Sequence, residues 1–303
     1  MSRIPTFAEI PAGFVHTSIP LGLTETGMLL WNPDVEPHML LTGRTRTGKT
    51  SLVRTVIKGL SERGADIVLI DPKRSALVDV ASLPGVLGRA TSRDLDDVSH
   101  KIGWVERRMM ERYDALEQGA RAEDLNRLVL VVDEGRLLYE LTKTHWNTVV
   151  KPRELARAKA VKSPVRPVGT EHPCIEQIRS ILRLGGEAKV SVVLISQQAD
   201  ASWLSTEARQ NLGMRVALGN MDDDGLGMMF GRRTRLEPLP TGEDGAPIKG
   251  RAYAATVGDR PVQMQAFWTP EIPRPDARVP GSLPTQPIPV QQQRRSLLRR
   301  LVG

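Results

Sequence analysis

Cysteine is nearly absent from this chain of 303 residues, which contains only Cys174. A single cysteine cannot form an intramolecular disulfide, so the composition gives secretion no support and favours a cytoplasmic location. We expect Cys174 to be an inert thiol rather than a nucleophile. Residues 1–10 also lack the apolar core of a signal peptide.

Long apolar runs are missing as well. The longest stretches, such as 128–132 and 192–195, fall far short of the roughly 18 residues that a bilayer-spanning helix needs. We therefore expect no transmembrane segment, and we expect any membrane association to be peripheral, through a membrane-anchored partner protein.

Positive charge is in excess. Hydrophobic residues make up 40% of the chain and charged residues 25%, which is typical of a soluble globular protein. The net charge is +7 and the sequence pI is about 9.8. This excess favours an anionic partner, either nucleic acid or an anionic membrane surface. A basic protein without a polyanionic partner would have the same composition.

Short apolar runs alternate with helical stretches from residue 37 onward. We expect strands at 38–42, 66–70, 128–132, 190–196 and 214–218, and a further short strand at 28–31. Helices are expected at 50–63, 94–118 and 175–184. Continuous apolar runs of about five residues are typical of strands buried on both faces of a parallel sheet. The alternation of strands and helices predicts an α/β doubly wound domain.

Composition divides the chain into a lead-in (1–36), a main domain (37–269) and a tail (270–303) rich in proline and glutamine. A tail of this composition cannot build a packed core, so we expect it to be disordered. Its end places four arginines, at 294, 295, 299 and 300, around three leucines. This basic patch could contact DNA, lipid or a partner protein.

Residues 141–173 interrupt the alternation of strands and helices in the main domain and resemble an insertion. Seven lysines and arginines lie between Lys143 and Arg166, against one acidic residue, Glu154. We expect part helix, at 154–161, and part loop. The insertion is either a DNA-contacting element or a solvated excursion.

The first chemical motif is Gly-Arg-Thr-Arg-Thr-Gly-Lys-Thr at 43–50, which satisfies the P-loop pattern G-x-x-x-x-G-K-[ST]. The expected ATP-binding residues are Gly43, Arg44, Thr45, Arg46, Thr47, Gly48, Lys49, Thr50 and Ser51. The glycines let successive backbone N–H groups cradle phosphates at a helix N-terminus. Lys49 would reach the β- and γ-phosphates, and the Thr50 hydroxyl would be a ligand of Mg²⁺. The motif therefore predicts ATP and Mg²⁺ as cofactors.

The second motif is a buried strand, 128–132, that ends in two adjacent carboxylates. Asp133 is placed to hold Mg²⁺ as a Walker B aspartate does, and Glu134 to polarise the attacking water as general base. A third strand, 192–196, ends at Gln197, which we expect to sense the γ-phosphate or orient that water. Its alternative is a polar strand end without a role.

Four islands together resemble the FtsK/SpoIIIE-type DNA translocases, which are RecA-like hexameric motors. They are residues 38–50, residues 67–73 ending in Asp71-Pro72-Lys73, residues 107–113, and residues 178–186 with 193–197. Generic P-loop proteins lack the Asp-Pro-Lys island. The resemblance covers roughly residues 20–270. The chain's size is more similar to the short Tra translocases of actinomycete conjugative elements than to a full-length cell-division protein.

The resemblance implies a RecA-like P-loop domain with a mostly parallel central sheet, and an ATPase that drives double-stranded DNA through a ring, as a homohexamer. It also implies an arginine that acts on the ATP of a neighbouring subunit. Arg215 is our candidate for that arginine, with Arg209 and the pair Arg232 and Arg233 as rivals. The expected roles are conjugative transfer or DNA segregation. Alternatives are a protein-secretion or phage DNA-packaging motor of the same fold, or a nucleotide-dependent switch.

Overall fold

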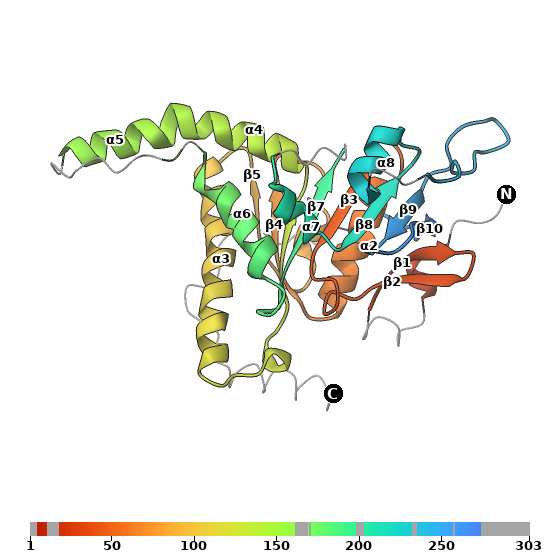
Figure 1. Ribbon diagram of the computed structural model, residues 1–303, viewed down its shortest axis with the longest axis horizontal. Helices are drawn as coiled ribbons and strands as arrows, with labels where there is room; N and C mark the ends of the chain where they lie inside the picture. The colour runs from red at the N-terminus through yellow and green to blue at the C-terminus, as the bar shows by residue number, and fades with distance from the viewer. Residues whose placement is uncertain are drawn as a thin grey trace.

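Ten strands form one continuous sheet in the order β2-β1-β10-β9-β8-β3-β7-β6-β4-β5 (Figure 1). The computed structural model describes residues 5–10, 18–160, 169, 171–197, 203–231, 235–256 and 258–273. Its strands are β1 (Ile19–Thr24), β2 (Gly27–Trp31), β3 (Met39–Gly43), β4 (Asp66–Asp71), β5 (Val86–Thr91), β6 (Leu128–Val132), β7 (Val190–Ser196), β8 (Met214–Leu218), β9 (Arg251–Ala255) and β10 (Val262–Ala266).

Its helices are α2 (Lys49–Glu62), α3 (Leu95–Glu117), α4 (Gly135–His145), α5 (Lys151–Ala160), α6 (Pro173–Leu184), α7 (Thr206–Gln210) and α8 (Asp223–Phe230). Short 3-10 turns lie at Phe7–Glu9, Val80–Ser82 and Ala122–Asp124, and a π-helical turn at Trp146–Val150 joins α4 to α5.

The strands from β8 to β5 pair in parallel, whereas β1, β2, β9 and β10 pair antiparallel on one side of the sheet. The prediction of a mostly parallel α/β sheet is confirmed, and all six expected strands are present within a residue or two of their predicted ends. The structure adds β1, β5, β9 and β10, which the apolar runs did not indicate because these strands are mixed in character.

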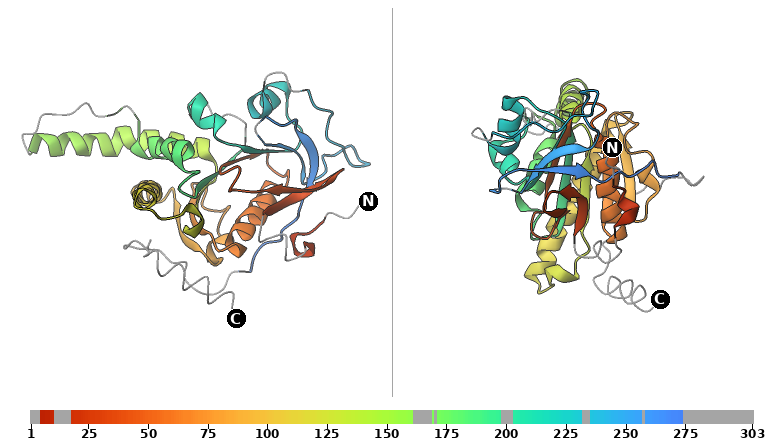
Figure 2. Two further views of the ribbon diagram at one scale, coloured as in Figure 1. Left: turned by 60° about the horizontal axis from the view of Figure 1, so that its bottom comes forward. Right: turned by 90° about the vertical axis from the view of Figure 1, so that its right-hand side faces the viewer.

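Both faces of the sheet are buried, which explains the continuous apolar runs. Alternate residues of β6 face opposite ways: Leu130 joins the core under α3 and α6, and Val131 joins the core under α2. Figure 2 shows α2 on one side of the sheet and α3, α6 and α8 on the other. Five parallel strands buried on both faces, β8, β3, β7, β6 and β4, hold the loops at their carboxyl ends in fixed relative positions.

The predicted domain boundary at residue 37 is wrong. Strands β1 and β2 form a hairpin that pairs with β10, so residues 19–31 belong to the same sheet as the main domain. At the other end, the backbone N–H of Ile272 donates to Asp79, so the packed domain extends past residue 269. The expected disordered tail lies outside the described residues from 274 onward.

The predicted loop in the insertion is also wrong for residues 141–153. Helices α4 and α5 and the π turn between them form one helical run, roughly 39 Å long at 1.5 Å per residue. Pro152 lies within this run, as the second residue of α5. A π turn directly precedes it and changes the hydrogen-bond pattern where the proline N–H is missing. This run is called the arm below, and it projects from the body near β5 in Figures 1 and 2.

Two expectations from the missing residue types can be compared with the structure. Cys174 is fully buried in α6, where burial raises the pKa of its thiol to about 12, as expected of an inert cysteine. In the part of the chain that the structure describes, no helix has the length and apolarity needed to cross a bilayer.

Candidate functional site

The carboxyl ends of the parallel strands place the sequence motifs at one edge of the sheet. Strand β3 leads into the P-loop, β6 leads into Asp133 and Glu134, and β7 leads into Gln197. The strands are in register there: Thr42 pairs with Ser196, and the N–H of Asp133 donates to the carbonyl of Ile70. Segments more than 80 residues apart in the sequence therefore meet around one cavity.

The P-loop owes its shape to glycine at two positions. Gly48 adopts a left-handed conformation, with φ of 100°, directly before α2. A Cβ on Gly43 would lie 2.8 Å from both Leu218 Cβ and Thr47 Oγ1, so only glycine allows β8 and the loop to approach this closely. The Thr47 hydroxyl donates to the carbonyl of Arg44, and the N–H of Gly250 donates to that of Thr47. The loop is thus held in its curled form.

Seven of the nine expected ATP-binding residues, all but Gly43 and Thr47, line a cavity of about 510 Å³ in front of the N-terminus of α2. Members of the P-loop from 44 to 51, except Thr47, line it together with Lys73, Asp133, Glu134, Gln197 and Lys249. A helix N-terminus with an adjacent lysine attracts phosphate through backbone N–H groups and the helix dipole. Ser51 also makes a structural contact, since its hydroxyl accepts a hydrogen bond from the N–H of Thr269 at 2.8 Å.

Glu134 is the point where the site converges. Its Oε1 accepts from Lys49 Nζ at 3.1 Å and from Lys73 Nζ at 2.9 Å, and its side chain also bonds Gln197. Its backbone is left-handed, with φ of 49° and ψ of 58°, a conformation that costs a non-glycine residue free energy. Burial opposes ionisation of this carboxyl, but the donors from Lys73, Lys49 and Gln197 outweigh burial and lower its pKa. An ionised carboxylate held in this way suits a general base.

Asp133 has the opposite character. Burial, followed by the neighbouring charge of Glu134, raises the pKa of Asp133 to about 7. A buried carboxylate with too little positive charge nearby fits a divalent cation, which would stabilise its ionised form. The exposed Thr50, at the start of α2, lies on the same cavity and supplies a hydroxyl. These two residues therefore fit Mg²⁺, which in nucleotide sites keeps waters and phosphates among its ligands rather than a protein cage.

Lys73 is a site residue to which the motifs assigned no role. The turn that carries Lys73 is held in place by Asp71, which is fully buried. The Oδ2 atom of Asp71 accepts hydrogen bonds from Arg89, at 2.6 Å, and from the N–H of Leu77. The N–H of Arg74 donates to the carbonyl of Asp71 and closes the turn. Pro72 further restricts the backbone. The Asp-Pro-Lys island could have indicated a functional lysine, but only the tertiary structure pairs it with Glu134.

Lys249 is a second residue of this cavity that the sequence motifs did not indicate. It precedes β9, lies in a segment without a motif, and reaches the cavity because Gly250 bonds the P-loop. No sequence signal distinguishes it from other exposed lysines.

Arg215 lies at the start of β8, at the edge of the sheet opposite to the P-loop. Its guanidinium donates to three carbonyls of its own chain, those of Leu212 at 2.9 Å, Met229 at 2.7 Å and Arg209 at 3.0 Å. These contacts tie α7, β8 and α8 together and favour a structural role over action on a neighbouring subunit. Arg209 is half-buried, and Arg232 and Arg233 lie outside the described residues.

Comparison with known proteins gives a consistent family. The model described as "FtsK/SpoIIIE family" matches residues 17–187, which is more than half of the chain. The Ftsk domain-containing protein YdcQ of Bacillus subtilis is 28% identical over 221 residues, covering 71% of this chain and 42% of that protein. The DNA translocase FtsK of Tropheryma whipplei is 26% identical over 196 residues, covering 56% of this chain and 26% of that one. The chain thus spans less than half the length of these relatives.

Solved structures share the fold. A monomer form of the pCW3 conjugation coupling protein TcpA with ATPgS superposes with a TM-score of 0.63 at 19% identity, over 86% of this chain and 71% of that one. ATPases 2 and 3 of EssC from Geobacillus thermodenitrificans give a TM-score of 0.64 at 15% identity, over 99% and 51%. With its P-loop, its paired carboxylates and this sheet, the chain belongs to the FtsK/SpoIIIE family of P-loop ATPases.

Proposed function

We propose that this chain hydrolyses ATP and uses the energy to move double-stranded DNA. The observation that carries the proposal is the convergence of Lys49, Lys73 and Gln197 on Glu134 beside the P-loop cavity. A switch that only binds nucleotide has no need of an ionised carboxylate held by three donors at this position.

The residues have distinct tasks in this proposal. Lys49 leaves Glu134 for the β- and γ-phosphates when ATP enters, because the phosphates carry the larger negative charge. Glu134 keeps its bond to Lys73 and accepts a proton from the attacking water, which Gln197 orients. Thr50 and Asp133 would hold Mg²⁺, which when bound neutralises charge on the transferring phosphoryl group.

The net positive charge of the chain and the names of its relatives both favour DNA as the substrate. The net charge of +7 suits a polyanion, and relatives in the family are named DNA translocase FtsK. Contacts to the phosphate backbone would be largely independent of base sequence and sensitive to salt. We further propose that the motor works as a ring of six identical subunits, as the resemblance implies, and that a partner protein provides any membrane location.

The first test is steady-state ATP hydrolysis with and without duplex DNA, for the unchanged chain and for Lys49→Ala and Glu134→Gln. We expect duplex DNA to raise the rate several-fold, and we expect higher salt to reduce that stimulation. Both variants should lose hydrolysis by at least about a hundredfold, in line with the usual contribution of positioned acid–base groups. Glu134→Gln should still bind ATP, since it retains the P-loop.

The same experiment separates the alternatives. Protein secretion is the second candidate, because the ESX secretion system protein EccC of Thermomonospora curvata is 33% identical over 97 residues, although these cover only 30% of this chain. Hydrolysis that ignores duplex DNA but responds to a basic or apolar peptide would favour that candidate. No hydrolysis under either condition, with ATP binding intact, would favour the switch.

A further inference from the structure

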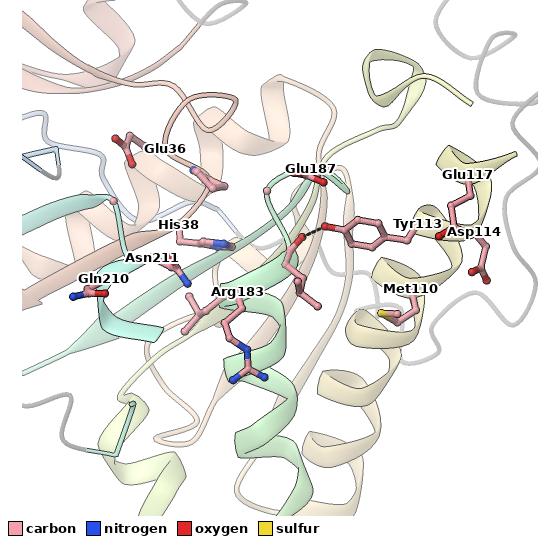
Figure 3. Close-up of a pocket in the computed structure, with 15 residues that line it drawn as sticks. Glu36, His38, Met110, Tyr113, Asp114, Glu117, Arg183, Glu187, Gln210 and Asn211 are labelled. Carbon is pink, nitrogen blue, oxygen red and sulfur yellow. Dashed lines mark hydrogen bonds between the residues drawn. The ribbon is translucent and has the colours of Figure 1, made fainter. Parts of the chain in front are cut away.

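A second large cavity lies at the edge of the sheet opposite to the P-loop (Figure 3). Its volume is about 630 Å³, within the range of specific binding pockets. Helix α3 forms one wall and the end of α6 another, and residues 36–38 and 213, which precede β3 and β8, form the floor. We call this cavity the amino-edge groove.

The amino-edge groove is acidic. Glu36, Asp114, Glu117 and Glu187 line it, and Figure 3 shows Asp114 and Glu117 on the last turns of α3. In the described part of the chain, no cationic side chain pairs with Asp114, Glu117 or Glu187. The one arginine in the lining, Arg183, is already bonded to Glu176 at 2.8 Å. The groove therefore has unbalanced negative charge, on a protein whose net charge is positive.

The groove is also partly apolar. The side chain of Met110 is 48% exposed and that of Leu184 44% exposed, and both line the cavity. Tyr113, which also lines the cavity, is held by a hydrogen bond from its hydroxyl to the carbonyl of Leu184, at 2.6 Å. Exposed apolar side chains ringed by carboxylates favour a ligand with the reverse pattern, namely leucines flanked by arginines.

This chain contains such a segment near its end. Residues 294–301 read Arg-Arg-Ser-Leu-Leu-Arg-Arg-Leu, with four arginines and three leucines and no acidic residue. Leucines at 297, 298 and 301 have the spacing of one face of an amphipathic helix, the pattern that helix-in-groove recognition uses.

The segment can reach the groove. Twenty residues, 274–293, separate it from Pro273, the last residue that the structure describes. An extended chain rich in proline covers about 3.1 Å per residue, or roughly 60 Å in all. A domain of this size has a radius of gyration of about 19 Å, so such a tether spans its diameter.

We propose that residues 294–301 dock in the amino-edge groove of their own chain, with the leucines against Met110 and Leu184 and the arginines against the carboxylates at its rim. The proposal is independent of the proposed DNA substrate. Because the groove and the P-loop lie at opposite edges of the sheet, docking leaves the ATP cavity open.

The test is the rate of crosslinking within the full-length chain. One variant combines Met110→Cys with Ser296→Cys, and a matched control combines Val262→Cys with Ser296→Cys. Val262 is 42% exposed on β10 and does not line the groove. The native Cys174 is fully buried and stays in both. With a short bismaleimide at low salt, we expect the Met110 pair to crosslink at least fivefold faster than the control pair.

Charge reversal makes the test specific. Asp114→Lys with Glu117→Lys should bring the Met110 pair down to the control rate, and it should not impair folding because lysine is favourable near a helix C-terminus. Adding Arg299→Glu and Arg300→Glu should restore the fast rate. Recovery through the reversed pair would not occur if the first change had merely damaged the fold.

Three results would overturn the proposal. Equal rates for the Met110 and Val262 pairs would show a tail that samples the surface without docking. Crosslinks that form only between copies, seen by mixing chains of two masses, would assign the contact to an interface. A third result combines equal crosslinking rates with slower maleimide labelling of Ser296→Cys when duplex DNA or phosphatidylserine vesicles are added. It would show that the arginines bind a polyanion rather than the groove.

Discussion

Glu134 combines a strained backbone, a buried side chain and a negative charge held by two lysines. Its left-handed backbone turns the side chain back toward the P-loop at the start of α4. Two lysines and an amide then keep a buried carboxylate ionised. Asp133, one residue earlier, has a raised pKa because it is buried and lies beside the negative charge of Glu134. Adjacent carboxylates thus acquire opposite pKa shifts from their surroundings alone.

Lys73 is predicted to position the general base. Lys73→Met removes a charge-assisted hydrogen bond of 2.9 Å from Glu134 without touching the P-loop. We expect the turnover number for ATP to fall roughly ten- to a hundredfold, within the contribution of a positioned base. Binding of a fluorescent ATP analogue should change less than threefold.

Lys249→Met is the matched control for Lys73→Met, because Lys249 lines the same cavity and its loss changes the same charge. It should affect turnover far less. Lys73→Arg should recover part of the activity. A large loss of ATP affinity in Lys73→Met, with turnover unchanged, would instead make Lys73 a phosphate ligand.

Among the elements, the arm has no obvious structural purpose at its outer end. Its inner half is anchored, since Leu138 and Trp146 are buried and the Trp146 indole donates to the carbonyl of Gly169. Its outer half, α5, has no buried residue and has four basic side chains against one glutamate. An exposed basic helix at the outer end of an arm whose first helix, α4, begins directly after Glu134 suits a contact with DNA phosphates.

Charge removal on the arm tests this contact. Arg157→Gln with Lys159→Gln should weaken binding to duplex DNA and lower the dependence of log K on log salt by about 2, at about 0.9 per phosphate contact. Hydrolysis without DNA should be unchanged, because α5 is remote from the cavity. Titrations at several salt concentrations measure both quantities.

Arg93→Gln with Arg107→Gln removes the same charge from exposed positions on the body of the domain. If this pair lowered the salt dependence as much as the arm pair did, the arm would be a solvated excursion and net charge alone would explain the binding.

At the scale of the whole molecule, a buried histidine links stability to pH. His38 is 1% exposed at the foot of β3, where its Nδ1 accepts from the N–H of Val192 at 3.0 Å. Burial, and then the charge of Arg127, lowers the pKa of His38 to about 3. Below pH 6.5 the unfolded chain binds a proton here that the folded chain does not, so stability present above pH 6.5 is lost as the pH falls.

We expect the free energy of unfolding to fall by about 1.5 kcal/mol between pH 6.5 and pH 5 through His38 alone. Urea unfolding of the unchanged chain and of His38→Asn, which retains an acceptor for Val192, would measure the difference between their pH dependences. His100→Asn, at an exposed position on α3, is the control. Identical pH dependence in all three chains would contradict the assignment to His38.

Features of this protein that depend on short-range pattern can be read from the order of its residues. The P-loop, the Asp133–Glu134 pair and Gln197 each follow an apolar strand, and the carboxyl ends of parallel strands must meet at one edge. Continuous apolar runs identified five of the parallel strands, β3, β4, β6, β7 and β8, because burial on both faces leaves no alternation. The family resemblance rested on the same short islands.

Features that depend on contacts between distant segments become visible only in the folded chain. Strands β9 and β10 are recruited by hydrogen bonds to β8 and to β1, across more than 200 residues in the case of β1. Lys73 and Lys249 reach the cavity because contacts with distant segments fix the turns that carry them. The guanidinium of Arg215 donates hydrogen bonds to carbonyls of its own chain. Local sequence patterns indicate which residues are buried, but the packing of the whole chain determines which strands and side chains contact one another.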